Sequence, residues 1–260
     1  MNIIVLTENC AGSGFLAEHG LSYLIESEGE KILFDTGSTN VFKKNASTLG
    51  IDIQKEVNTV VLSHGHWDHG DGLQYINDKT LITHPNVFIK RYRKKNNSFI
   101  GLKLSKSEIE QKFNLVLTKE PYYISENIIF LSQIPLLNNF EAKTTNFIDE
   151  NNQPDFVIDD SAMVVIENNQ LVIITACSHS GICNIIDYAI KVTGISTINA
   201  VIGGFHLKEN NLQTKYTIDF IKEKNIHKVY PSHCTEFPAL VAFYKQFNIE
   251  QLKTGMVLNF

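Results

Sequence analysis

Residues 60–73 are Val60-Val61-Leu62-Ser63-His64-Gly65-His66-Trp67-Asp68-His69-Gly70-Asp71-Gly72-Leu73. The apolar run Thr59 to Leu62 predicts a buried strand, and three histidines and an aspartate follow it directly. His64 and His66 are two residues apart, so their side chains leave an extended backbone on the same side. This spacing suits two nitrogen ligands on one metal ion.

The second half of the stretch supplies further donors. We expect Asp68 and His69 to follow a turn and to bind a second metal ion close by. The glycines at 65, 70 and 72 let the backbone fold tightly, and we expect a helix to begin near Gly72. Imidazole together with carboxylate favours zinc, with manganese or iron as alternatives, whereas calcium and magnesium prefer oxygen ligands alone. The other interpretation is a polar loop, which has no need of so many titratable nitrogens.

The pattern His-x-His-x-Asp-His after an apolar strand resembles the signature of the metallo-β-lactamase superfamily. The longer stretch from His64 to Leu73 resembles one branch of this superfamily, named after 7,8-dihydropterin-6-methyl-4-(β-D-ribofuranosyl)aminobenzene-5'-phosphate synthase. Most bacterial members of that branch are called metal-dependent hydrolases. Other sequence segments that match this branch are Ala17-Glu-His-Gly-Leu-Ser22, Ile32-Leu-Phe-Asp-Thr-Gly37, Ala176-Cys-Ser-His-Ser-Gly-Ile182, Gly203-Gly-Phe-His-Leu207 and Pro231-Ser-His-Cys-Thr235. They run from residue 17 to 235, so the resemblance covers nearly the whole chain.

Composition limits the class of protein. The chain has 260 residues, of which 43% are hydrophobic and 20% charged, as expected for a soluble globular protein with one large domain or two small ones. Its net charge of -5 gives no reason to expect nucleic-acid or membrane partners. We see no N-terminal targeting segment, because Ile3 to Leu6 is too short. Four cysteines without a C-x-x-C pair favour a reducing cytoplasm, and the oligomeric state is not indicated.

Strand and helix patterns alternate along the chain. We expect hairpins over Leu21–Glu26 with Lys31–Phe34 and over Ala162–Glu167 with Leu171–Ala176, the second turning at Asn168-Asn169. We expect helices over Ile182–Val192, over Leu212–Lys224, from Pro238 to Phe247, and from a capping box at Ser105-x-x-Glu108 to Asn114. This order suits two sheets packed face to face with helices outside. The resemblance implies the same fold, an α/β (α+β), four-layer αβ/βα sandwich in a single domain over 1–260.

Two segments between these elements invite a functional interpretation. Asn138 to Asp155 is rich in asparagine and weakly periodic, so we expect a long loop near the site mouth or a lid. Lys90 to Lys95 is locally basic, and either it is solvated or it binds a phosphate of the substrate.

Histidines and one aspartate recur after the predicted strands. Asp35, His64, His84, His179, His206 and His233 each lie within a few residues after an apolar run. Open α/β sheets build their sites from the loops at the carboxyl ends of the strands. We therefore expect these side chains to converge on one rim.

The resemblance assigns most of these residues to two divalent metal ions. His64 and His66 match ligands of the first ion, Asp68 and His69 match ligands of the second, and His233 matches the superfamily's last histidine, also on the second ion. The superfamily pattern further has a histidine before the second hairpin and a bridging aspartate after it, and both are missing here. We expect His179 to be the replacement ligand. Cys177 is a second candidate for the bridging position or a buried small apolar residue.

The remaining residues have supporting roles. We expect Asp35 to accept a proton from a ligand imidazole, with a turn aspartate as the alternative. His206 follows two glycines, and we interpret it as a substrate-binding or proton-donating residue, with metal ligation as the rival. We expect His84 to be a hydrogen-bonded rim residue and His19 a loop residue near the site.

These features predict a metal-dependent hydrolase of a small phosphoester or other ester. Asp68 would orient the attacking water and His206 would protonate the leaving group. One alternative is a pterin-related synthase, as in the branch's name. The other is a metal-bearing metabolite-binding protein with little turnover.

Overall fold

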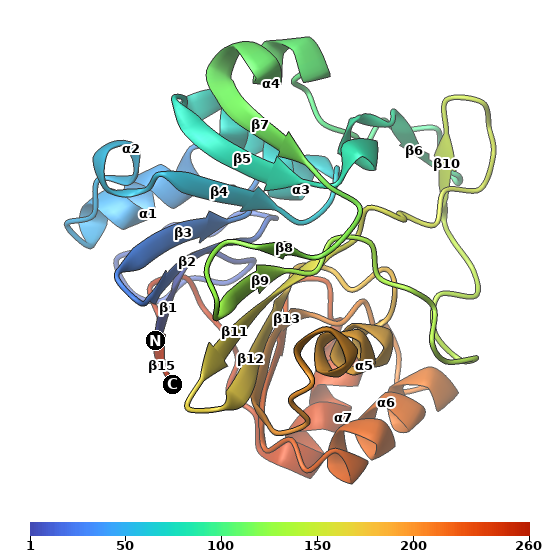
Figure 1. Ribbon diagram of the computed structural model, residues 1–260. Helices are drawn as coiled ribbons and strands as arrows, with labels where there is room; N and C mark the ends of the chain where they lie inside the picture. The colour runs from blue at the N-terminus through green and yellow to red at the C-terminus, as the bar shows by residue number, and fades with distance from the viewer. The chain divides into compact units, whose positions relative to one another are not determined.

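Figure 1 shows the computed structural model, which describes residues 1–260. The chain divides into two units with separate sheets, and each unit is described by itself. Unit 1 comprises Met1–Lys119, Thr145–Asp155 and Lys253–Asn259. Unit 2 comprises Glu120–Thr144, Phe156–Leu252 and Phe260. Both contain strands and helices, so the predicted mixed α/β class is confirmed.

Unit 1 contains a seven-stranded sheet in the order β15-β1-β2-β3-β4-β5-β7. The strands are β1 Asn2–Thr7, β2 Ser22–Ser27, β3 Glu30–Phe34, β4 Thr59–Leu62, β5 Lys79–Thr83, β7 Phe113–Leu117 and β15 Val257–Asn259. The four strands β3, β4, β5 and β7 are parallel to their neighbours in this series. Their carboxyl ends therefore lie at one edge of the sheet.

The predicted hairpin of β2 and β3 is confirmed. Its two turn residues, Glu28 and Gly29, both have positive φ, 54° and 82°. Positive φ at both positions is the geometry of the two-residue turn that matches the twist of a hairpin.

The helices of unit 1 are short. They are α1 Val41–Thr48, α2 Ile53–Glu56, α3 Trp67–Gly70, η1 Asp71–Tyr75, η2 Pro85–Phe88 and α4 Lys106–Lys112. Phe42 of α1, Ile53 of α2 and Ile109 of α4 belong to one buried cluster with Val60 and Leu81 of the sheet. These helices thus bury the same face of the sheet, and that packing holds the strand ends in place.

Two helix boundaries differ from the prediction. The helix expected near Gly72 begins earlier, at Trp67, so Asp68 and His69 lie on a helical turn and not after one. The capping box at Ser105 is present, since both of its hydrogen bonds to Glu108 form. Its helix ends at Lys112, before the predicted Asn114, because Phe113 enters the parallel strand β7 beside β5.

A small second sheet of unit 1 pairs β6 Arg91–Arg93 with β10 Phe147–Asp149. The segment predicted as a loop or lid therefore contains a strand, since pairing with β6 satisfies its backbone. Arg91 is fully buried, and its Nε donates to Asp155 Oδ2 at 2.7 Å. The interpretation of the basic run as solvated is therefore wrong for Arg91, whereas Lys90, Arg93 and the next two lysines are exposed. Phosphate binding by the run stays a prediction.

Unit 2 contains a six-stranded sheet in the order β14-β13-β12-β11-β9-β8. The strands are β8 Tyr122–Tyr123, β9 Ile128–Phe130, β11 Ala162–Glu167, β12 Gln170–Thr175, β13 Ile198–Gly204 and β14 Lys228–Ser232. The predicted hairpin of β11 and β12 is confirmed, with Asn168 and Asn169 at φ 51° and 59°. The strands β12, β13 and β14 are parallel.

Three helices lie on one side of this sheet, as Figure 1 shows. They are α5 Ile182–Thr193, α6 Leu212–Glu223 and α7 Phe237–Phe247, each within one residue of its predicted bounds. Ile185, Ile221 and Phe243 from these helices form one buried cluster with Ile173 and Val201 of the sheet. The parallel strands and their crossover helices thus place three successive strand ends side by side.

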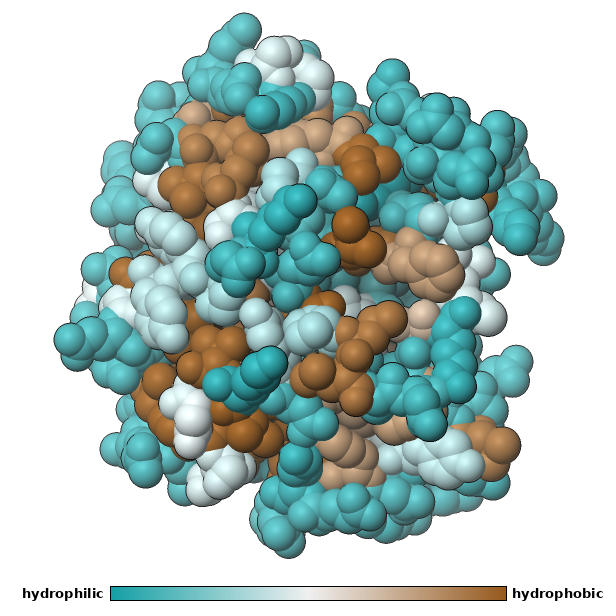
Figure 2. Space-filling model, turned by 45° about the vertical axis from the view of Figure 1, so that its right-hand side comes forward, coloured by the Kyte–Doolittle hydropathy of each residue, from teal (hydrophilic) through white to brown (hydrophobic).

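The surface is mixed in character. On the face drawn in Figure 2, hydrophilic residues predominate and hydrophobic residues reach the surface in several separate groups. The structure has no helix whose length and apolar content would allow it to cross a membrane.

Candidate metal centre

The strand ends of unit 1 carry the residues that the sequence predicted. Asp35 follows β3, His64 lies two residues after β4, and His84 follows β5. Because these three strands are parallel neighbours, the three residues lie at the same edge of the sheet.

Asp35 is the hub of a buried hydrogen-bond network. It is fully buried, with φ at 57°, and its Oδ1 accepts from the backbone N–H of Ser63 at 2.8 Å. Its Oδ2 accepts from Ser63 Oγ and from His69 Nδ1, each at 2.7 Å. A carboxylate can only accept, so His69 Nδ1 donates this hydrogen bond and Nε2 is the ring nitrogen left to face a metal ion. The expected contact of Asp35 with an imidazole is therefore present.

His64 and His66 face one another. Ser63 Oγ lies 2.9 Å from His64 Nδ1, and His64 Nε2 lies 2.9 Å from His66 Nδ1. Two nitrogens bound to one tetrahedral zinc at about 2.0–2.1 Å would be about 3.3 Å apart. The pair therefore stands close to ligand spacing, and both side chains are buried.

Asp68 and His69 add two donors from helix α3. Asp68 Oδ2 lies 3.9 Å from His69 Nε2, and the rings of His64 and His69 are 4.3 Å apart between centroids. The donor set of three imidazoles and one carboxylate fits a borderline divalent metal.

The loop before β2 lies against this helix. His19 Nε2 contacts Asp68 Oδ2 at 3.2 Å, and the backbone N–H of Leu21 donates to Asp68 O at 3.2 Å. The side chain of His19 is 53% exposed, so His19 lies between the buried cluster and the solvent. This position agrees with the loop residue near the site that we expected.

Gly65 sits where no side chain would fit. A Cβ added there would lie 2.0 Å from Val87 O and 2.8 Å from Arg91 Nη1. The loop at Gly65 therefore packs directly against η2 and against Arg91, which pairs with the buried Asp155. This packing holds the adjacent His64 and His66 in place.

His84 takes a structural position. It is fully buried, and its Nδ1 accepts from the backbone N–H of Asn86 at 3.1 Å, which caps η2. It is hydrogen-bonded as predicted, but buried because the chain turns into η2 directly after it. The ring of Trp67 lies 5.6 Å from that of His19.

Unit 2 brings together a second cluster. The donor atoms of Cys177, His206 and Cys234 all lie within 4.8 Å of one another. The ring of His179 is 4.4 Å from that of His206. Cys234 was missed by sequence reasoning, and the available signal was its position two residues after a strand, like that of the other two.

The thiol of Cys234 is electrostatically unusual. Burial raises its pKa, but hydrogen bonds with the side chains of Cys177 and His206 and the charges of His206 and His233 hold the pKa well below the ordinary value. The thiolate is the form that binds metals and reacts with electrophiles.

The six predicted metal ligands are divided between the two units. His64, His66, Asp68 and His69 belong to unit 1, and His179 and His233 belong to unit 2. Their joint ligation of two ions stays a prediction, as do the catalytic role of His206 and the bridging role of Cys177.

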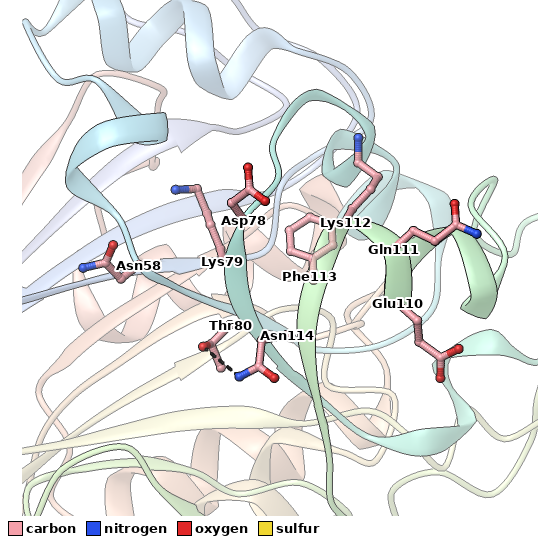
Figure 3. Close-up of a pocket in the computed structure, with 9 residues that line it drawn as sticks. All are labelled: Asn58, Asp78, Lys79, Thr80, Glu110, Gln111, Lys112, Phe113 and Asn114. Atoms are coloured by element: carbon pink, nitrogen blue, oxygen red, sulfur yellow. Dashed lines mark hydrogen bonds between the residues drawn. The ribbon is translucent and has the colours of Figure 1, made fainter.

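A polar surface cavity of about 420 Å³ in unit 1 lies at the opposite strand ends (Figure 3). Its lining includes Asn58 before β4, Lys79 at the start of β5 and Phe113 at the start of β7. These are the amino ends of parallel strands, whereas sites in open α/β sheets lie at the carboxyl ends. The cavity is thus separate from the histidine cluster.

Comparison with known proteins identifies the family. A model of the metallo-β-lactamase superfamily matches residues 17–86. The chain is 33% identical, over its whole length and 97% of the relative, to the 7,8-dihydropterin-6-methyl-4-(β-D-ribofuranosyl)-aminobenzene-5'-phosphate synthase of Methanocaldococcus jannaschii. It is 32% identical to an uncharacterised protein of the same organism, over 98% of this chain and 99% of that one.

Solved structures point the same way. Tm1679, described as a metal-dependent hydrolase of the β-lactamase superfamily, has a TM-score of 0.89 and 31% identity, covering 100% of this chain and 99% of its own. A diphosphatase of the PhnP family, with a TM-score of 0.57, 13% identity and coverage of 100% and 97%, shares the fold alone. This chain belongs to the metallo-β-lactamase superfamily. The predicted family and fold class are confirmed.

Proposed function

We propose that this protein is a metal-dependent hydrolase that acts on a small phosphoester or another small ester. The observation that carries the proposal is the hydrogen bond of His69 Nδ1 to the buried Asp35. It leaves Nε2 of His69 as a metal donor beside the carboxylate of Asp68. A merely structural aspartate–histidine pair would not need His64 and His66 at ligand spacing next to it.

The proposed metal ligands are the six that the sequence predicts: His64, His66, Asp68, His69, His179 and His233. When bound, the ions, zinc in the first instance, supply Lewis-acid activation of water and of the bond under attack. The chain's own residues then orient the reactants.

Asp68 is the proposed catalytic carboxylate. It accepts a hydrogen bond from the attacking water and aims it, which is a positioning and electrostatic role. Its contact with His19 at 3.2 Å restrains the carboxylate in one orientation. Ser63 and Asp35 act one step further away, because they orient His64 and His69.

The support for a phosphorylated substrate comes mainly from a relative. The name of the synthase that is 33% identical contains a 5'-phosphate. The basic run contributes less than its sequence suggests, because Arg91 is buried against Asp155 and Lys90 lies 3.8 Å from Glu150.

A synthase of the same class as that relative is the second candidate. The observation that favours it is identity along the whole chain, not only in the metal motif. In that case the same residues would hold the ions that activate the leaving group of a dihydropterin-type or ribofuranosyl phosphate substrate, which an aromatic partner displaces.

The deciding experiment is turnover by zinc- or manganese-loaded protein. We expect cleavage of a generic phosphodiester, and we expect Asp68→Asn to lower kcat by about 10²- to 10³-fold while the fold is retained. Asp71→Asn is the matched control, because Asp71 is a buried aspartate of the same stretch whose Oδ1 accepts from the backbone N–H of Lys103. No turnover of phosphomonoesters, phosphodiesters or thioesters would refute the hydrolase, and tight binding of a dihydropterin would then favour the synthase.

A further inference from the structure

Three side chains of unit 2 share an unusual position in the fold. Cys177, His206 and Cys234 each lie two residues after a strand, namely β12, β13 and β14. These strands are parallel and adjacent in the sheet. Because the carboxyl ends of parallel neighbours lie side by side, the equal offset brings two sulfurs and one imidazole to a single point.

We infer that Cys177, His206 and Cys234 form a cation site of unit 2 that binds a thiophilic ion such as Zn²⁺ or Cu(I). This inference goes beyond the proposed hydrolase activity and does not depend on it. It takes the rival interpretation of His206, metal ligation in place of proton donation, and assigns Cys177 to this ion in place of the bridging position.

The three turns are tied together by hydrogen bonds. The backbone N–H of Gly204 donates to Ala176 O at 2.9 Å, and Ser178 Oγ donates to Gly204 O at 2.7 Å. On the other side, the backbone N–H of Phe205 donates to Thr235 Oγ1 at 3.0 Å. The turn after β13 is thus fixed to both of its neighbours, so the donors are held in place before an ion binds.

Gly204 leaves the space that the sulfur of Cys234 occupies. A Cβ at residue 204 would lie 2.5 Å from Cys234 Sγ and 2.4 Å from Ala176 O. The same sulfur lies 3.4 Å from Cys177 O. The thiol therefore points between the turns and toward the other two donors.

The donor types and spacing match a known coordination chemistry. Two thiolates and one imidazole are a ligand set that zinc accepts with a fourth position left open, and soft thiolates select Zn²⁺ or Cu(I). At about 2.3 Å per Zn–S bond, two sulfurs on a tetrahedral zinc are about 3.8 Å apart. The three donor atoms already lie within 4.8 Å of each other, so closure around an ion needs only small side-chain movements.

An ion at this site would affect its surroundings. His233 precedes Cys234 directly, and His179 lies two residues after Cys177. An ion bound to the two cysteines would therefore fix the turns that carry both histidines. The other two cysteines lack this setting, since Cys183 is buried within the core cluster on α5 and Cys10 lies in unit 1.

The test is titration of reduced, metal-free protein with Co²⁺ and with Cd²⁺. We expect a thiolate-to-metal charge-transfer absorption in the near ultraviolet that saturates at one ion. Cys234→Ser and Cys177→Ser should each weaken that binding at least tenfold, because each removes one of three protein ligands. Cys10→Ser is the control and should titrate like the wild type.

A second set of variants separates this site from the proposed catalytic one. His64→Ala should keep the charge-transfer absorption and lose phosphodiester cleavage, so the failure of one proposal is distinguishable from the failure of the other. Circular dichroism of each variant shows whether it folds, and Cys234→Ala replaces the serine variant if that one does not. The inference is overturned if reduced wild-type protein shows no charge-transfer absorption, or if both cysteine variants keep it at full strength. It is equally overturned if Cys177 and Cys234 oxidise to a disulfide but the reduced protein binds no ion.

Discussion

Replacement of Asp35 by asparagine tests how the fold prepares a ligand. Asp35→Asn keeps the size of the side chain and one carbonyl oxygen, which can still accept from the backbone N–H of Ser63. The new amide group, however, is a donor at the position where Oδ2 now accepts from His69 Nδ1 at 2.7 Å. His69 would then accept on Nδ1 and carry its proton on Nε2, the atom that is otherwise left for a metal.

The magnitude follows from this change of tautomer. Loss of the partner that orients a metal-bound histidine weakens metal affinity by about 10- to 100-fold, which is about 1.4–2.7 kcal/mol. Because the site is fully buried, water cannot replace the carboxylate. We expect this loss in a competition titration of zinc against a chromophoric chelator, at a pH where the chelator is fully deprotonated.

Asp71→Asn is again the matched control, since Asp71 is buried in the same stretch and its Oδ1 accepts from a backbone N–H and not from an imidazole. We expect its zinc affinity to stay within about twofold of the wild type, well inside the 10-fold lower bound set for loss of an orienting partner. The reasoning is refuted if Asp35→Asn, shown by circular dichroism to be folded, binds zinc as tightly as the wild type.

Two further predictions concern stability. Burial raises the pKa of Glu141, which caps α5 by accepting from the backbone N–H groups of Cys183 and Asn184. Because the pKa is higher in the folded state, the stability of the wild type relative to Glu141→Gln should be greatest below the unfolded pKa and should decline as the pH rises through the folded pKa. Thermal unfolding over that range checks this, and an unchanged difference would contradict it. Arg91→Met leaves the buried Asp155 without its partner and should cost about 3–5 kcal/mol in urea unfolding; a loss below about 1 kcal/mol would mean that the pair is not buried as described.

Much of the fold could be predicted from local patterns. Both hairpins follow from apolar runs around turn residues that tolerate positive φ, such as Asn168 and Asn169. The helices α5, α6 and α7 follow from their apolar periodicity and end signals, including a left-handed Gly194 after α5. Turn residues and helix periodicity depend only on residues close together in the chain, so they can be recognised from the sequence alone.

Segments whose structure depends on distant partners were not predicted. The strand β7 follows α4 without a break and exists because β5 offers a parallel edge. In the same way, β10 forms because β6 pairs with it, across more than fifty residues of chain. Neither segment has the alternation that marks a strand by itself, because pairing supplies the stabilisation.

The sequence by itself determined the family and the fold class, and it predicted the chemical type of the site. The pattern from His64 to His69 and the position of Asp35 after a strand are enough for that, since ligand spacing along a strand end is a local property. Only the tertiary structure decided that Asp35 contacts His69, that Arg91 is buried under Gly65, and that Cys234 meets Cys177 and His206. The physical reason is that parallel strands align residues that are far apart in the chain, and the register of that alignment is set by packing over the whole sheet.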